Sequence, residues 1–440
     1  MKFDVVIIGA GAAGLSAARD LSGAGKRVCI IEARERAGGR IDTRRIDGVA
    51  MPVELGAEFI HGEAEATFAA VNAAPLIALQ LPDTHFWSHD GKWSKHHDFW
   101  TRIARLRAKI PDRKRDVSFA QFLRSQRGID PQLRDLAYNF VEGYHAAHAD
   151  RISAAALRSA DGETEAPAQF RIVNGYDRVM QWLLAGVAPD RSELRLNTVV
   201  KRVRWRTGDV VVETARDTIR ARAAVITIPL GVWKAPHDSD GSIEFDPPLR
   251  EKERAVEQLE LGHVVKIVFR FREPFWEPEV NFVHTNDRYM PTWWTYAPVR
   301  APILIGWAGG HAADALLTES EEARVSRAID SMAAAFGTKR RRIESLLVAT
   351  YMHDWQSDPF SRCAYSYAGV GGAEAHKLLG KPVARTLFFA GEATSGDQTG
   401  TVAGAIESGR RAESEILRVA RASSRRPGAQ AGKPAPHEDA

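Results

Sequence analysis

The sequence predicts a mixed α/β fold with more than one domain. The chain has 440 residues, of which 44% are apolar, so it is long enough to build two or three cores. Its N-terminal segment alternates short apolar runs with a helical stretch, which is the pattern of a strand–helix–strand unit. Further apolar runs predict later strands at residues 210–213, 223–228, 264–271, 303–307 and 387–390. Helical or polar stretches, such as 248–259, separate these strands.

The first three elements follow from the apolar pattern. Residues 3–8 form a β-branched run that suits a strand buried on both faces of a parallel sheet. Residues 12–21 then predict a helix, and residues 27–32 repeat the apolar run as a second strand, which completes one βαβ unit. Further along, the pair Asp90-Gly91 lies between aromatic flanks and predicts a β-hairpin, because both residues tolerate a positive φ.

The turn between the first strand and the helix predicts a dinucleotide site of Rossmann type. Gly9, Gly11 and Gly14 form a GxGxxG pattern, which supplies a tight turn, access for a pyrophosphate and close helix packing. Ala13 lies in the same helical turn, whose free N–H groups face the phosphate. Glu32 ends the second strand, where a carboxylate accepts hydrogen bonds from the ribose hydroxyls.

A second glycine pair indicates which dinucleotide is bound. Arg34, Gly39 and Arg40 belong to the segment 34–40, which brings more backbone and positive charge to a pyrophosphate than NAD requires, so it favours FAD. Here the sequence resembles the flavin amine oxidase superfamily, whose members carry E-x5-GGR after the glycine fingerprint. The resemblance continues in blocks to about residue 418.

The resemblance implies a Rossmann-type FAD-binding domain of discontinuous segments and an α+β substrate domain with a mixed sheet. A polar tail rich in Gly, Pro and Ala is expected to be disordered. The expected segments are 1–82, 166–248 and 357–420 for FAD binding, 83–165 and 249–356 for the substrate, and 421–440 for the tail.

The segment 54–62 resembles the ELGAxxIHG block of the superfamily. The resemblance implies that Gly56, Ala57 and Glu58 lie against the flavin, and that His61 lies near the substrate as in polyamine oxidases. The alternative is a buried loop histidine without a chemical task. Related amino-acid oxidases carry an arginine here for the substrate carboxylate, whereas this chain has Glu58-Phe59, so an α-amino acid substrate is disfavoured.

Two strand candidates carry further site residues. Lys266 interrupts the apolar run 263–269, and lysine is rarely buried without a partner. By resemblance it holds a water against flavin N5 and is the strongest catalytic candidate; the alternative is the polar face of an edge strand. The strand expected over 196–203 places Val200 against adenine by the same resemblance.

The C-terminal blocks 387–394 and 400–409 resemble the FFAGE and GTVxGAxxSG motifs of the superfamily. The first implies that Gly391 and Glu392 reach the phosphate–ribityl region. The second implies a helix that begins near Thr401 and points its N-terminus at the N1/O2 side of the flavin, which stabilises the reduced anionic ring. Gly400, Thr401 and Val402 are therefore expected at the cofactor.

In many amine oxidases of the superfamily, two aromatic rings flank the substrate and form a sleeve that favours a neutral amine. This sequence departs from that pattern. Tyr365 matches one ring, but Thr401 stands at the usual place of the second tyrosine. Ala364 replaces the cysteine that binds flavin in mitochondrial monoamine oxidases, which predicts noncovalent FAD. The candidates to complete the sleeve are Trp355, also expected at the cofactor, Tyr367, and an aromatic from Trp293, Trp294 and Tyr296.

The amino-acid composition limits the classes of binding partner and the cellular compartment that we expect for this protein. The net charge is +4 with dispersed basic residues, which argues against nucleic acid. Two cysteines indicate a reducing compartment, and no apolar stretch is long enough to cross a bilayer, so we expect a cytoplasmic protein without a membrane partner. A homodimer is a candidate assembly. The histidines at 85, 89, 96 and 97 fit an exposed hairpin better than a metal site.

These observations predict an FAD-dependent amine oxidase. A hydride passes from the carbon next to a neutral amine to flavin N5, the imine is hydrolysed, and O2 is reduced to H2O2. Lys266 and the His61 block favour this activity over a desaturase or a protoporphyrinogen-oxidase-like enzyme. A non-enzymatic flavoprotein would match the cofactor blocks equally well, and the choice between polyamines and aromatic or alkyl monoamines stays open.

Overall fold

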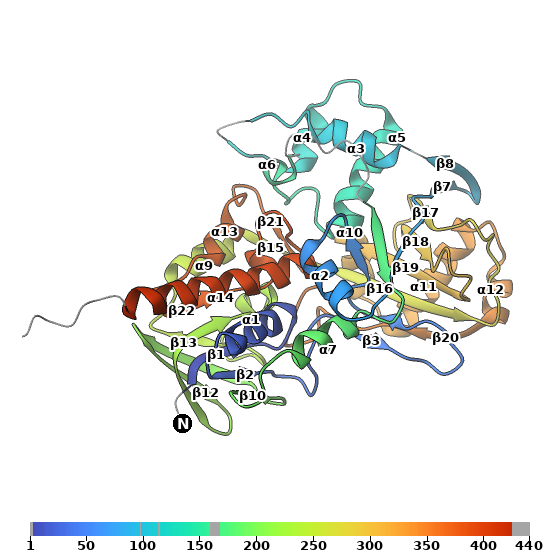
Figure 1. Cartoon of the computed structure of the whole chain (residues 1–440). Coiled ribbons are helices and arrows are strands. Elements are labelled where there is room, and N and C mark those ends of the chain that lie inside the picture. The colour runs from blue at the N-terminus through green and yellow to red at the C-terminus, as the bar shows by residue number, and fades with distance from the viewer. Residues whose placement is uncertain (1–2, 97, 113–114, 159–167, 425–440) are drawn as a thin grey trace, which may run out of the picture.

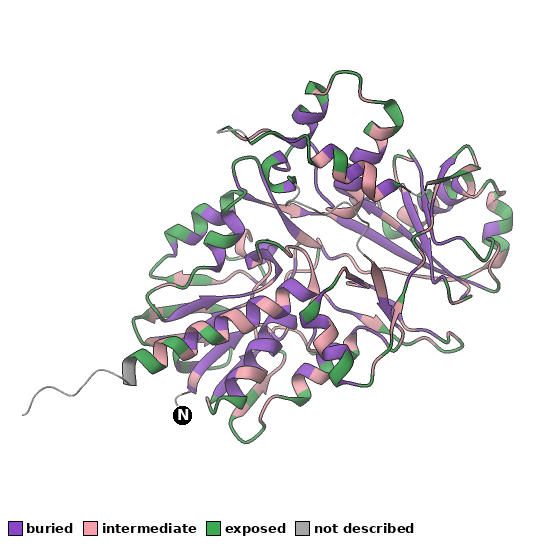
Figure 2. Cartoon of the chain, turned by 45° about the horizontal axis from the view of Figure 1, so that its top comes forward, coloured by how far each residue is buried: buried purple, intermediate pink, exposed green. Residues whose placement is uncertain are grey.

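The computed structural model describes residues 3–96, 98–112, 115–158 and 168–424. Two large sheets lie side by side, and a layer of short helices covers one end of the gap between them (Figure 1). Strands of both sheets are mostly buried, while the outer helices turn exposed sides to solvent (Figure 2). None of the helices among these residues is long and apolar enough to cross a membrane.

The first sheet is built around the N-terminal βαβ unit, which is confirmed. Strand β1 pairs in parallel with β2 on one side and with β13 on the other, and β22 pairs in parallel with β13. The order is β10-β2-β1-β13-β12-β11-β14. The strands are β1 (Phe3–Ile8), β2 (Val28–Ile31), β10 (Ser192–Arg195), β11 (Val200–Arg206), β12 (Asp209–Thr214), β13 (Thr218–Ile226), β14 (Glu244–Asp246) and β22 (Leu387–Phe389).

Helices from the two ends of the chain meet on this sheet. Helix α1 (Ala12–Gly23) runs along α14 (Val402–Ser424), and the Ser16 hydroxyl donates to the Ile406 carbonyl over 3.0 Å. The other helices of this half are α2 (Glu65–Ala73), α7 (Asp177–Ala185), α8 (Leu230–Trp233), α9 (Arg250–Glu257), α13 (Ala375–Gly380) and the 3-10 turn η2 (Glu392–Thr394).

The second sheet has seven strands in the order β20-β16-β19-β18-β17-β7-β8. One face packs against α10 (Gly310–Leu317), α11 (Glu321–Ala335) and α12 (Arg340–Leu346) through a continuous apolar core. The strands are β7 (His85–His89), β8 (Lys92–His96), β16 (Val264–Phe271), β17 (Phe282–His284), β18 (Thr292–Thr295), β19 (Ile303–Gly309) and β20 (Leu347–Tyr351).

A helical layer with its own apolar core lies over the end of the second sheet. It consists of α3 (Phe99–Arg107), α4 (Phe119–Ser125), α5 (Pro131–Tyr138), the π-helical turn η1 (Asn139–Tyr144) and α6 (Ala154–Leu157). Small sheets connect the halves through β3 (Thr43–Arg44), β4 (Val53–Glu54), β5 (Phe59–His61), β6 (Ala78–Gln80), β9 (Gln169–Ile172), β15 (Leu259–Gly262) and β21 (Tyr365–Ala368).

The structure confirms one local sequence prediction and corrects two others. The hairpin is confirmed: β7 and β8 pair antiparallel, with Asp90 at φ 50° and Gly91 at φ 73°. The strand expected over 196–203 begins only at Val200, because Asn197 adopts φ 50° in a turn. The tail expected from residue 421 is wrong for 421–424, which continue α14, since adding a turn to an existing helix is cheap. Residues 425–440 lie outside the described part.

Candidate active site

One cavity of about 890 Å³ extends from the β1–α1 turn across to the second sheet and the helical layer. All the residues expected to bind cofactor or to act in catalysis line it, except Gly14. Gly14 lies behind the wall, where a Cβ would stand 2.0 Å from the Gly9 carbonyl oxygen. The sequence blocks, which are far apart in the chain, therefore converge on a single cavity.

The nucleotide end of the cavity fits a dinucleotide. Gly9 has φ 107°, and no atom lies within 4 Å of the place where a Cβ on Gly11 would stand, so the backbone is open to a close ligand. Glu32 Oε2 accepts from the Ala10 N–H over 2.8 Å, and Oε1 accepts from the Arg34 N–H over 2.9 Å. These bonds fix the carboxylate at the end of β2, beside the glycine loop.

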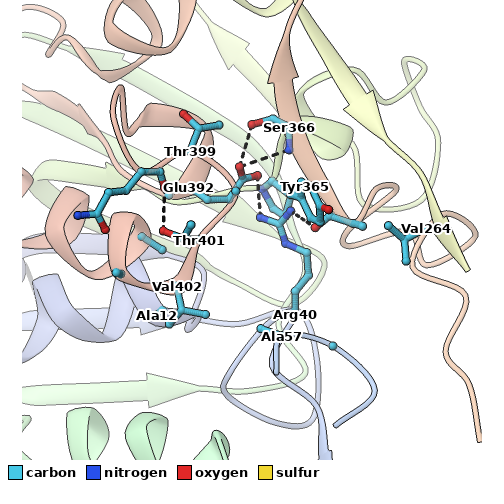
Figure 3. A pocket seen from close by; sticks show the side chains of 18 of the residues that line it. Ala12, Arg40, Ala57, Val264, Tyr365, Ser366, Glu392, Thr399, Thr401 and Val402 are labelled. Carbon is cyan, nitrogen blue, oxygen red and sulfur yellow. Dashed lines mark hydrogen bonds and ion pairs between the residues drawn. The ribbon is translucent and has the colours of Figure 1, made fainter. Parts of the chain in front are cut away.

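Two arginines of the GGR segment are already paired with carboxylates. Arg34 bonds Asp358 over 2.7 Å, although it also lines the cavity. Arg40 Nη2 donates to Glu392 Oε1 over 3.1 Å, and the other Glu392 oxygen accepts from the Ser366 hydroxyl over 2.8 Å (Figure 3). The Arg40–Glu392 pair thus joins the β2 side of the cavity to the start of η2.

Thr401 lines the cavity and also caps the helix that begins there. Its hydroxyl accepts from the Gly404 N–H over 3.0 Å. The same hydroxyl donates to the Gln398 carbonyl over 2.8 Å (Figure 3). The neighbouring Gly400 has φ 77°, and a Cβ there would lie 3.2 Å from the ring of Tyr365. The absence of a side chain at Gly400 therefore lets the Tyr365 ring lie close to the start of α14.

The aromatic wall differs from the one expected. Trp294, Trp355 and Tyr367 line the cavity, whereas Trp293 lies in the core on the other sheet face and Tyr296 donates to the Pro52 carbonyl. Two rings that the sequence patterns did not single out, Tyr144 and Trp307, line it as well. The Tyr144 carbonyl accepts from the Tyr365 hydroxyl over 2.7 Å, which ties η1 to β21.

His61 lies at this wall on β5. Its ring centroid is 5.3 Å from that of Tyr144, and its Nδ1 is buried without a hydrogen-bond partner in the described part of the chain. Burial lowers the pKa of His61 to about 4. The imidazole is therefore neutral near pH 7, with a ring nitrogen available to a ligand.

Lys266 is buried in the second sheet. Strand β16 lies between β19 and β20, so the edge-strand alternative is wrong. Its ammonium donates to Glu58 Oε2 over 2.6 Å and to the Gly56 carbonyl over 3.2 Å. An ammonium has three N–H donors, so one donor remains for a group in the cavity.

Glu58 is the centre of a buried charge network. Arg171 Nη2 donates to its Oε1 over 2.7 Å, and the Trp294 indole N–H donates to the same oxygen over 3.1 Å. Burial opposes ionisation, but the charges of Lys266 and Arg171 outweigh it and lower the pKa of Glu58. Arg171, on β9, was not predicted; no local motif marks it, because it reaches Glu58 only through the fold.

The histidines near the hairpin do not form a metal centre in the described residues. The expectation of exposed histidines is wrong for His85, which is buried and hydrogen-bonds His284 over 2.9 Å and Asp83 over 3.0 Å. His89 is exposed beside Asp90. No group of three or more His, Cys, Asp or Glu side chains within that part of the chain could hold a metal ion. His97 lies outside it.

Comparison with known proteins decides the family. The family described as flavin containing amine oxidoreductase matches residues 12–417. The chain belongs to this family. This amine oxidoreductase is therefore FAD-dependent and acts on amines, as the sequence blocks predicted.

Relatives of this amine oxidoreductase include oxidases and demethylases. Polyamine oxidase 3 of Oryza sativa subsp. japonica is 31% identical, and the match covers 93% of this chain and 88% of the relative. Lysine-specific histone demethylase 1 homolog 3 of Arabidopsis thaliana is 28% identical, but the match covers 95% of this chain and only 30% of the demethylase.

Solved structures share the fold of this amine oxidoreductase. Putrescine oxidase bound to putrescine has a TM-score of 0.79 at 23% identity, covering 95% of this chain and 99% of the other. Cyclohexylamine oxidase from Brevibacterium oxydans IH-35A has a TM-score of 0.80 at 18% identity, covering 96% and 100%. The mixed α/β prediction is thus confirmed as the fold of amine oxidases.

Gly14→Ala is expected to abolish FAD retention. The new Cβ would stand 2.0 Å from a backbone oxygen of the glycine loop, so either α1 or the loop must move. The purified variant should lack the flavin absorbance near 450 nm that wild-type holoenzyme shows. Gly23→Ala is the matched control in the same helix, because no atom lies within 4 Å of its Cβ position; a variant at Gly14 that keeps full flavin would contradict the expectation.

Proposed function

We propose that this amine oxidase couples the oxidation of a polyamine or monoamine to the reduction of O2 to H2O2, with noncovalently bound FAD. The observation that carries the proposal is the convergence of Lys266, His61 and Tyr365 on the cavity that the nucleotide loop opens. When bound, FAD supplies the hydride acceptor for the carbon next to the amine nitrogen.

The protein side chains select and orient the amine. The rings of Tyr144, Trp307 and Tyr365 exclude water and favour an uncharged amine, and neutral His61 offers a ring nitrogen. Lys266 uses its remaining N–H to hold a water at the flavin side, which assists proton movement. Glu32, Arg40 and the capped N-terminus of α14 line the cavity and would hold the cofactor's polar groups.

Two observations support noncovalent FAD and a reducing compartment. Ala364 precedes Tyr365, and Cys363 is buried outside the cavity lining, where burial raises the pKa of its thiol to about 11. Cys29 and Cys363 are both free. We place the protein in the cytoplasm on that basis; a homodimer remains a prediction.

The likeness to polyamine oxidases and the His61 block support a polyamine as the first substrate class. The aromatic wall favours a second class, monoamines with an apolar substituent. An anaerobic screen separates them: spermidine, spermine, benzylamine and hexylamine are mixed in turn with holoenzyme, and bleaching of the flavin absorbance identifies the substrates. If no amine bleaches the flavin, the proposal fails; if reoxidation in air forms no peroxide, the O2 part fails.

The pH dependence of kcat/KM is expected to follow the substrate amine. Activity should rise with pH as the amine loses its proton, and His61 should add no inflection near pH 6.5. The reason is that burial depresses the pKa of His61 to about 4, so the imidazole has lost its proton well below that pH. Two amines of different pKa should give curves displaced by that difference. Curves that coincide would contradict this assignment.

A further inference from the structure

The strand register of the second sheet lays a row of side chains along the cavity. Lys266 is opposite Trp307, Trp307 is opposite Thr292, and Thr292 is opposite His284 on four neighbouring strands. All four line the cavity. Neighbouring strands are about 4.8 Å apart, so Thr292 lies about 10 Å along the sheet from Lys266. Successive side chains of this row therefore lie at increasing distances from Lys266, where the reaction is proposed to occur.

Thr292 in this row and Trp100 on α3 each carry a hydrogen-bonding group without a partner in the described part of the chain. These groups are the Thr292 hydroxyl, on a side chain that is 7% exposed, and the Trp100 indole N–H. Both residues line the cavity. A buried polar group without a partner costs free energy, which a ligand that supplies the partner recovers.

The charge of this end of the cavity disfavours a second ammonium. The described lining residues contributed by α3, η1 and α6 include Arg107 and no carboxylate. Burial, with a contribution from Arg107, lowers the pKa of nearby His145 to about 3, so this imidazole stays neutral. A distal cation would find no carboxylate among the described lining residues of these three elements, whereas an oxygen acceptor would be complementary to the Thr292 hydroxyl and the Trp100 N–H.

We infer that the far end of the cavity is a subsite for an uncharged oxygen of the substrate, a hydroxyl or a carbonyl, separated from the reacting amine by an apolar chain of about six carbons. The inference rests on the proposed function and narrows its substrate class. The Thr292 hydroxyl and the Trp100 N–H bind the oxygen, and Trp307 contacts the apolar chain. Specificity follows because an analogue without the oxygen leaves the donors unpaired.

The test compares the kcat/KM of the holoenzyme for amines of similar length. The amines are hexylamine, 6-aminohexan-1-ol, 1,6-diaminohexane and a mono-N-acetylated diamine. The wild-type enzyme should give the highest kcat/KM with the amino alcohol or the acetylated diamine. A preference for the first identifies a hydroxyl subsite, and a preference for the second a carbonyl subsite. Preference for 1,6-diaminohexane would overturn the inference.

Thr292→Val tests the subsite directly because valine matches threonine in shape. The ratio of kcat/KM for the oxygenated amine to that for hexylamine should fall about 3- to 10-fold, which corresponds to the net free energy of one hydrogen bond. Thr292→Ser keeps the hydroxyl and should retain the preference. An unchanged preference in the valine variant would overturn the subsite. If none of the amines bleaches the flavin anaerobically, the proposed function itself fails, which is a separate result.

Discussion

Replacing Lys266 by methionine is expected to slow the reaction of the reduced enzyme with O2 by about 100- to 1000-fold. Methionine keeps most of the side-chain length but removes the ammonium that Glu58 and the Gly56 carbonyl hold at the cavity. The rate is measured by stopped flow, with enzyme reduced by substrate and mixed with oxygenated buffer. A separate anaerobic measurement gives the rate of reduction by the amine, so the two half-reactions are resolved.

Lys252→Met is the matched control for this prediction. Lys252 is also buried, but its ammonium donates to the carbonyls of Leu378, Leu379 and Lys381, outside the cavity lining. The control should lower stability and leave the rate of reoxidation near that of the wild type. A Lys266 variant whose reoxidation stays within about threefold of the wild type would remove this lysine from the mechanism.

Glu58→Ala is expected to lower the free energy of unfolding by about 3–5 kcal/mol. The carboxylate bonds both Lys266 and Arg171, so its loss leaves two buried cations without their counter-charge. Urea unfolding followed by tryptophan fluorescence measures the change. Glu58→Gln retains hydrogen-bond acceptance without the charge and should lose part of this stability.

A surface pair provides the comparison for Glu58. Glu344 bonds Arg340 over 2.8 Å, but its side chain is 46% exposed, so Glu344→Ala should cost less than about 1 kcal/mol. Equal effects at Glu58 and Glu344 would show that the buried network contributes no more than a solvated ion pair. Restoration of stability by changing Arg171 together with Glu58 would confirm their coupling.

The cofactor side could be predicted because its information is local in the sequence. Turns, charged residues and apolar strands lie within a few residues of one another in the glycine loop, at Glu32 and around Glu392. Resemblance to the amine oxidase superfamily then supplies the expected role of each segment. Lys266 was found for a similar reason, since a single lysine in an apolar strand requires a partner. What local pattern could not supply was the identity of that partner, Glu58.

The substrate side depends on contacts between distant segments. Arg171 reaches Glu58 from β9, and Thr292 and Trp307 become neighbours only through the register of β18 and β19. Tyr144 enters the cavity from a π-helical turn, which has no strong sequence signature. Aromatic residues can be recognised in a sequence, but the face of the sheet on which each lies depends on strand pairing, as the opposite positions of Trp293 and Trp294 show.

The contact between α1 and α14 joins an early helix to a late one, so the cofactor cavity needs segments from both ends of the described chain. The glycine loop leaves the ribosome first, whereas β22, Glu392 and α14 are among the last described segments to be made. Until they emerge, β13 lacks the neighbour β22 and α1 lacks the helix that covers it. A chain that ends before β22 would keep the glycine loop but would lack Glu392, Thr401 and Val402 from the wall of the cavity, so we expect it to retain FAD poorly.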